Sequence, residues 1–183
     1  MRRILLALPL TLLPLAAAQA HDETAHASLG KHEHGIATLN VALDGQTLEI
    51  QLESPAMNIV GFEHAANSTA DKATAAAART RLGQPLQLFA LPAAAGCSVI
   101  SSELHSPLFD AAPQPQADAH THQHTDVDAD YALNCAHPEQ LRDLDLSPLF
   151  SQFPATIKVN VQLIGPSGQQ GAELSRDNPR LSF

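Results

Sequence analysis

Three histidines in the second half of the chain have a spacing that suits metal binding. His120, His122 and His124 follow one another with a single residue between neighbours. In an extended chain, residues two apart project to the same side, so three imidazoles can converge on one cation. Imidazole nitrogen is a ligand for zinc, copper and nickel, and the spacing does not choose among them. We predict a metal-binding segment here, within a flexible His-rich loop over residues 106–128.

A second group of histidines lies where the first strand is expected to begin. His32 and His34 flank Glu33 and share one side of an extended segment, and Gly35 then allows a close approach to the backbone. His64 supplies a third nitrogen if its segment folds back over the start of that strand. Three protein ligands with an open fourth position are typical of an exchangeable or catalytic zinc site, and four ligands of a structural one. We therefore predict an ordered site formed by His32, His34 and His64.

The chain has two cysteines, Cys97 and Cys135. In an oxidising compartment such a pair indicates a disulfide. By the chain-entropy model, a bond closing a loop of this length contributes roughly 4 kcal/mol of stability. The alternative, a pair of thiolate ligands for a metal ion, stays open at this point.

The first twenty residues have the three parts of a secretory signal peptide. Arg2 and Arg3 form a cationic start, residues 4–18 are apolar, and Ala18-Gln19-Ala20 has the small-x-small pattern of a cleavage site. The apolar part is shorter than the roughly 20 residues that a membrane-spanning helix needs, and no later segment approaches that length. We predict cleavage after Ala20, a single domain over residues 21–183 and no membrane span.

Charge restricts the classes of partner. The formal net charge of the 183 residues is −9, and removal of Arg2 and Arg3 with the signal peptide lowers it to −11. Nucleic acid and anionic membranes would repel such a chain, whereas cations would be attracted. All ten histidines lie after the predicted cleavage site. Composition therefore favours a cation as the ligand.

Alternating apolar residues predict an antiparallel hairpin near the start of the mature chain. Apolar residues alternate with polar or small ones over residues 37–43 and 48–52, and Asp44-Gly45 between them favours a tight turn. A two-residue loop at this dipeptide would place Val41 opposite Leu48. The apolar side chains of both strands would then share one face of the sheet.

Further patterns predict the remaining elements. Residues 97–105 and 130–135 indicate a second strand pair, with Cys97 opposite Cys135 and Glu103 opposite Ala129. A helix is expected over residues 69–82, capped by Ser68 or Thr69, and short helices are expected to begin near Pro55 and Ser147. Residues 157–163 alternate as a strand, residues 165–171 indicate a turn, and residues 181–183 a short final strand. These elements predict an α+β fold with an antiparallel sheet of five or six strands and two or three short helices on one face.

Several segments together resemble the ZrgA family of zinc-regulated periplasmic proteins. The matching segments are Lys31-His32-Glu33-His34-Gly35-Ile36-Ala37-Thr38-Leu39-Asn40-Val41-Ala42, Leu52-Glu53-Ser54-Pro55-Ala56-Met57-Asn58, Val60-Gly61-Phe62-Glu63-His64, Ala95-Gly96-Cys97 and Tyr131-Ala132-Leu133-Asn134-Cys135. A histidine-rich loop between the cysteines fits the same pattern. The resemblance implies a periplasmic protein that binds zinc and passes it to the solute-binding component of a zinc importer.

The leading hypothesis is therefore a non-enzymatic protein for zinc acquisition or buffering. Zinc would be captured at His120, His122 and His124 and retained at the ordered site. A zinc-dependent hydrolase, with Glu33 or Glu63 as general base, is a second hypothesis, but the chain has no HExxH motif and no nucleophile elbow. A third is a metal-independent protein that binds a partner in the periplasm.

Overall fold

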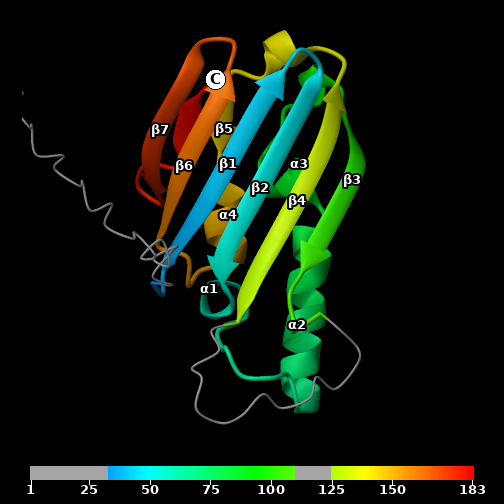
Figure 1. Cartoon of the computed structure of the whole chain (residues 1–183), viewed down its shortest axis with the longest axis vertical. Coiled ribbons are helices and arrows are strands. Elements are labelled where there is room, and N and C mark those ends of the chain that lie inside the picture. Colours follow the sequence, from blue (N-terminus) through cyan, green and yellow to red (C-terminus); the bar gives the residue numbers. More distant parts are fainter. Residues whose placement is uncertain (1–32, 110–124) are drawn as a thin grey trace, which may run out of the picture. The chain divides into compact units, whose positions relative to one another are not determined.

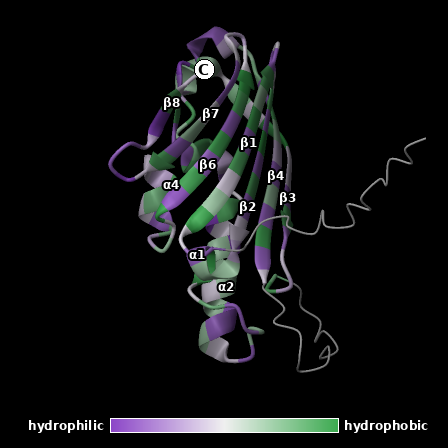
Figure 2. Ribbon diagram, turned by 60° about the vertical axis from the view of Figure 1, so that its left-hand side comes forward, coloured by the Kyte–Doolittle hydropathy of each residue, from purple (hydrophilic) through white to green (hydrophobic). Residues whose placement is uncertain are grey.

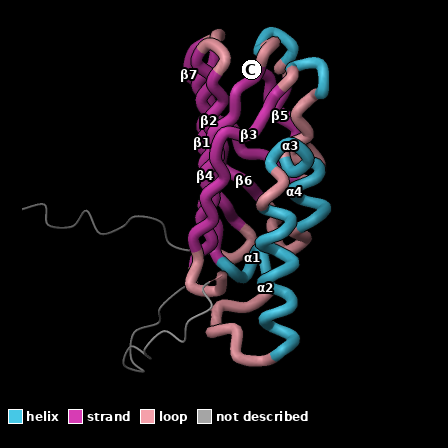
Figure 3. Tube along the Cα trace, turned by 90° about the vertical axis from the view of Figure 1, so that its right-hand side faces the viewer, coloured by secondary structure: helices cyan, strands magenta, loops and turns pink. Residues whose placement is uncertain are grey.

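The described chain is built around a six-stranded sheet with helices on one face (Figures 1 and 3). The computed structural model describes residues 33–109 and 125–183. The strands, in their order across the sheet, are β3 (Cys97–His105), β4 (Asp126–Cys135), β2 (Thr47–Pro55), β1 (Ile36–Asp44), β6 (Lys158–Gly165) and β7 (Gly168–Ser175). Two short strands, β5 (Asp143–Asp145) and β8 (Arg180–Ser182), form a separate antiparallel pair.

Four α-helices lie in the described part of the chain, one more than the upper limit of the prediction. They are α1 (Ala56–Val60), α2 (Thr69–Leu82), α3 (Pro85–Leu88) and α4 (Ser147–Gln152). Two short 3-10 helices are also present in this part, η1 (Ala93–Ala95) before β3 and η2 (Pro138–Gln140) after β4. The helices lie on one side of the sheet (Figure 3). The predicted α+β class, with a six-stranded sheet and helices on a single face, is confirmed.

The core lies between the sheet and these helices. Strands β1, β2, β4 and β6 alternate between buried and more exposed side chains, and Figure 2 shows the same alternation in hydropathy. The inward side chains pack against apolar residues in or directly after the helices, among them Leu82, Phe89 and Phe153, each at most 1% exposed. Burial of an apolar side chain of this size contributes about 1.5–3 kcal/mol to the free energy of unfolding. The packing of the helices on this face of the sheet is therefore the main source of stability.

One strand pair departs from the predicted antiparallel sheet: β1 and β6 are parallel. The strand over residues 157–163 was expected, and β6 does form there, but its direction depends on the preceding chain. Helix α4 returns the chain to the end of the sheet where β1 begins, so both strands start there (Figure 1). A parallel pair needs a crossover connection of this kind, which alternation within the strand does not reveal.

The first hairpin differs from its predicted register by two residues. Val41 pairs with Ile50 rather than with Leu48. The turn lies one residue later than predicted, at Gly45 and Gln46, and Gly45 has a φ of +56°. Glycine at the first central position is the signature of a type II′ turn. Because the shift is by two residues, each apolar side chain keeps its predicted face.

The second hairpin confirms the predicted disulfide and corrects the pairing beyond it. Cys97 is bonded to Cys135, and the two residues are paired across β3 and β4. A bulge between Val99 and Ser101 then shifts the register by one residue, so Glu103 faces Asp130 rather than Ala129. An extra residue in one strand has this effect.

Strand β4 is also longer than predicted, which shortens the predicted loop over residues 106–128. It begins at Asp126 rather than Asp130. The aspartates suggested a loop, but they alternate with inward residues such as Val127, which is fully buried. Residues 110–124 of the predicted His-rich loop lie outside the described residues.

The predictions for the remaining elements were correct in part. Helix α2 has the predicted bounds, and Ser68 caps it through reciprocal hydrogen bonds with Asp71. Helix α4 begins at the predicted Ser147, whose backbone N–H and hydroxyl donate hydrogen bonds to Asp145, while Leu146 is the N-cap residue and makes no side-chain cap. The turn expected over residues 165–171 was wrong in its extent, because β7 already begins at Gly168.

The amino-terminal predictions are not addressed by the described residues. The signal peptide over residues 1–20, the cleavage site after Ala20 and the segment up to His32 all lie outside them. Within the described ranges, no helix has the length and apolar character needed to cross a membrane.

The buried hydroxyl of Tyr131 gives a prediction about alkaline stability. It donates a hydrogen bond of 2.9 Å to the carbonyl oxygen of Leu82. Burial raises the pKa of Tyr131 well above its ordinary value, and the neighbouring Asp130 carboxylate adds to the rise. The folded state thus favours the neutral phenol, so this stability is present below pH of about 10, where the unfolded phenol ionises, and is lost as pH rises further.

The test compares wild type with Tyr131→Phe. The variant should lose about 1–2 kcal/mol at neutral pH, because the Leu82 carbonyl loses its donor, and its stability should fall less steeply above pH of about 10. Denaturant unfolding followed by circular dichroism measures both effects. The chain has one tyrosine and no tryptophan, so tyrosinate absorbance reports on this residue alone. Ionisation of the wild-type phenol near its ordinary pKa without unfolding would contradict the prediction.

A candidate metal-binding end of the sheet

The start of strand β1 is held in a tight backbone arrangement around Gly35. Gly35 has a φ of +88°, and a Cβ there would lie 2.9 Å from Cδ1 of Ile157. Its carbonyl oxygen accepts hydrogen bonds from the backbone N–H groups of Ile157 and Lys158, at 2.8 and 2.9 Å. Glycine is needed for both the positive φ and the close approach. The chain that approaches Gly35 closely is the segment entering β6, at Ile157 and Lys158.

A buried amide, Asn58 of α1, fixes the same segment from the other side. Its Oδ1 accepts a 2.6 Å hydrogen bond from the Gly35 N–H, and its Nδ2 donates to the Ile36 carbonyl at 2.9 Å and to Ser54 Oγ at 3.1 Å. Asn58 is 1% exposed. These contacts, which we call the Asn58 clamp, join the start of β1 to α1 and to the end of β2.

The clamp places His34 beside Glu63. Nε2 of His34 lies 3.0 Å from Oε1 of Glu63, although the two residues are 29 positions apart in the chain. The segment after β2 therefore does fold back to the start of β1, as the ordered-site prediction required. The direct partner of His34 is Glu63, which the sequence had suggested only as a general base for a hydrolase.

His64 lies next to this pair along the chain, at the beginning of the connection to α2. Its ring stacks on Phe62, with ring centres 4.7 Å apart, and its Nδ1 lies 3.0 Å from the Ala65 carbonyl oxygen. The pKa of Asp71, in the first turn of α2, is lowered chiefly by hydrogen bonds from Ser68 and further by the charge of His64. One acidic side chain, that of Asp71, thus lies near His64.

Both ends of the predicted loop are fixed by hydrogen bonds. At its start, Ser106 Oγ donates to the Asp126 carbonyl at 2.7 Å, and Leu108 is buried in the core. At its end, Thr125 Oγ1 donates to the Glu63 carbonyl at 2.8 Å, and the Thr125 carbonyl accepts from the Ala56 N–H at 2.8 Å. Thr125 directly follows His124 in the sequence. The chain at this point is therefore hydrogen-bonded to the backbone of Glu63, the partner of His34.

The described residues hold part of the predicted ligand set. His34 and His64 lie at this end of the sheet, whereas His32, His120, His122 and His124 fall outside the described residues. Within residues 33–109 and 125–183, no three His, Cys, Asp or Glu side chains come together as a metal site. The disulfide removes Cys97 and Cys135 as thiolate ligands. His105 and His137 are surface residues beside Glu103 and Glu139.

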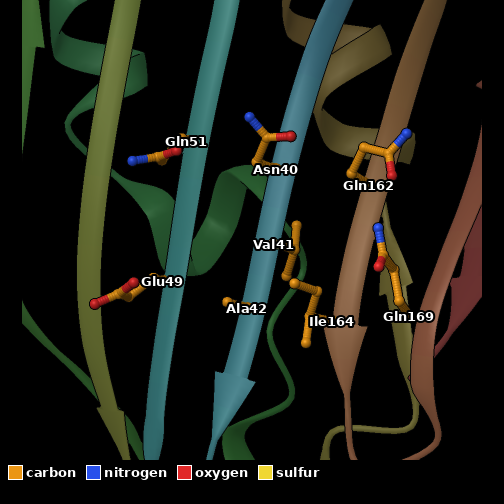
Figure 4. A pocket seen from close by; sticks show the side chains of 8 residues that line it. All are labelled: Asn40, Val41, Ala42, Glu49, Gln51, Gln162, Ile164 and Gln169. Atoms are coloured by element: carbon orange, nitrogen blue, oxygen red, sulfur yellow. The ribbon is translucent and has the colours of Figure 1, made fainter. Parts of the chain in front are cut away.

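The uncovered face of the sheet has a different chemistry. It carries a shallow hollow of about 350 Å³ (Figure 4). The polar side chains around it are those of Asn40, Glu49, Gln51, Gln162 and Gln169. Carboxamides form neutral hydrogen bonds, and with neither histidine nor cysteine the hollow lacks the ligands that zinc prefers. It matches the solvated face of an antiparallel sheet.

Comparison with known families gives one match. A family model described as ZrgA family zinc uptake protein matches residues 31–183. The matched region contains both cysteines and every histidine from His32 to His137. A search of curated proteins finds no significant match.

The Asn58 clamp predicts a large effect from a small substitution. Asn58→Ala leaves the Gly35 N–H and the Ile36 carbonyl without their partner in a buried setting, which should lower the free energy of unfolding by roughly 2–4 kcal/mol. Denaturant unfolding followed by circular dichroism measures the loss. Asn67→Ala, at an exposed position before α2, is the matched control and should change stability by less than about 0.5 kcal/mol. Equal effects of the two substitutions would refute the clamp.

Proposed function

Because the chain belongs to the ZrgA family of zinc uptake proteins, we propose that it binds zinc in the periplasm and supports its uptake without catalysing a reaction. The observation that carries this proposal is the meeting of three chain segments at one end of the sheet. These are the start of β1 with His34, the segment after α1 with Glu63 and His64, and Thr125 at the start of β4. Each adjoins one or more histidines in the sequence.

Zinc would be bound by the ordered histidines together with those that follow or precede them in the chain. Consecutive Cα atoms are about 3.8 Å apart, so His124 is tethered within one residue of Thr125, and His32 within two residues of His34. His32, His34 and His64 would form the retaining site, with His120, His122 and His124 as the capturing group. A neutral imidazole is required for each bond, so affinity should fall as pH drops through about 6.5, the ordinary value for histidine.

The site would exchange its zinc rather than hold it as a structural ion. The described residues bring together fewer than three metal-ligating side chains at any one place, so part of the ligand set must come from residues outside them. Ordering such a segment on binding costs conformational entropy, which moderates the affinity. The negative charge of the chain attracts the cation and raises the rate of capture. These are properties of a carrier.

The disulfide supports the compartment, whereas the partner is only what the resemblance to the ZrgA family implies. The disulfide between Cys97 and Cys135 suits an oxidising compartment. With the signal peptide over residues 1–20 removed after Ala20, this would be the periplasm. The receiver would be the solute-binding component of an ABC-type zinc importer.

Calorimetric titration with zinc tests the proposal. The disulfide-bonded protein should bind at least one zinc ion. The variants His34→Ala/His64→Ala and His120→Ala/His122→Ala/His124→Ala should each lose a binding site or at least about tenfold in affinity, because each removes two or three nitrogen ligands. The matched control is His105→Ala/His137→Ala, which removes two exposed histidines outside the proposed site and should bind as wild type does.

The outcomes separate the alternatives. If the His120/His122/His124 variant keeps a tight site, the ordered end is the primary site and the loop is accessory. If the wild-type protein binds no zinc at micromolar concentration, the zinc function is wrong, and a metal-independent partner-binding protein takes its place.

A further inference from the structure

His34 and His64 each have one ring nitrogen within hydrogen-bonding distance of an acceptor oxygen. For His34 this is Nε2, next to the Glu63 carboxylate, and for His64 it is Nδ1, next to the Ala65 carbonyl. An ionised carboxylate and a backbone carbonyl only accept hydrogen bonds, so in each case the ring nitrogen must carry the proton. In a neutral imidazole, the other nitrogen then has a free lone pair.

The Glu63 carboxylate is the more buried member of the pair, and the His34 imidazole lies between it and the solvent. The Glu63 side chain is 18% exposed and that of His34 is 53% exposed, so the imidazole is the more accessible of the two. Histidines that bind metal ions almost always donate their second ring N–H to a carboxylate, a carbonyl or water. This second contact fixes the tautomer and the orientation of the ring.

On the basis of the zinc function proposed above, we infer that Glu63 and the Ala65 carbonyl are positioning groups that select the zinc-binding nitrogens. Glu63 holds His34 in the Nε2–H form, so His34 binds zinc through Nδ1. The Ala65 carbonyl holds His64 in the Nδ1–H form, so His64 binds through Nε2. Glu63 acts through His34 and does not itself contact the ion.

The backbone around Glu63 is held firmly enough for this role. Gly61 ends α1 with a φ of +83° and donates its N–H to the Met57 carbonyl, which turns the chain toward β1. The Glu63 carbonyl accepts the Thr125 hydroxyl, and Phe62 stacks on His64. The Asn58 clamp holds the other member of the pair. The side chains of His34 and Glu63 are therefore already in the positions that favour the Nε2–H tautomer of His34.

Proton–nitrogen correlation spectra of the isotope-labelled, disulfide-bonded protein test the inference, because they identify the protonated ring nitrogen. In the zinc-free protein, Nε2 of His34 and Nδ1 of His64 should carry protons. Added zinc should shift the resonances of Nδ1 of His34 and Nε2 of His64. The reverse assignment of either ring would overturn the inference.

Two variants test the part played by Glu63. Glu63→Ala should give His34 as a mixture of tautomers and lower the zinc affinity about 10- to 100-fold in calorimetry. Glu63→Gln keeps an oxygen acceptor, so it should keep the Nε2–H form and lose less affinity. Glu139→Ala is the matched control, since it removes a carboxylate 3.6 Å from His137 near the opposite end of β4, and it should change neither property.

The failure of this inference can be told apart from failure of the zinc function. If the wild type binds zinc and Glu63→Ala changes neither the His34 tautomer nor the affinity, Glu63 is not a positioning residue and the zinc function stands. If the wild type binds no zinc, both fail.

Discussion

The buried amide of Asn58 is the contact on which the proposed zinc-binding end of the sheet depends. It accepts a hydrogen bond from the Gly35 N–H and donates one to the Ile36 carbonyl at the start of β1. Leaving such groups unpaired in the interior costs about 1–3 kcal/mol each. A single residue thus joins α1 to β1, and His34 can meet Glu63 because this junction is fixed. The pairing of His34 with Glu63 is thus a consequence of folding and is present without a ligand.

The apolar core and the end of the sheet that carries His34 and His64 have separate roles. Apolar side chains from four strands and the helices provide the stability, and none of them is needed to contact an ion. The sheet also fixes the two ends of the predicted loop, through the disulfide-closed β3–β4 hairpin and through Ser106 and Thr125. If this segment binds zinc as proposed, the entropy of ordering it would be lost only between those anchors.

The sequence predicted local features well and long-range ones poorly. Helix α2, its Ser68 cap and the Cys97–Cys135 pairing depend on signals within a few residues or on a single chemical pair, and they were correct. The parallel β1–β6 pair depends on where α4 returns the chain, and the Glu103 partner depends on one bulge, neither of which has a local signal. The same holds for the candidate site. The sequence indicated His34 and His64 as possible ligands, but the Asn58 clamp and the Glu63 contact join segments far apart in the chain and have no local signal.

A carrier must hold its ion less firmly than its receiver does, and the ligand placement proposed above suits that requirement. If all the nitrogens lay on the rigid sheet, the site would be preorganised and would bind the ion more tightly. Instead, two histidines lie at a fixed end, and on the proposed function the remaining ligands belong to segments that adjoin it at His34 and Thr125. Zinc could then be released by losing the adjoining ligands one at a time while the fold stays intact. The fixed histidines, with their tautomers already set, would remain ready for the next ion.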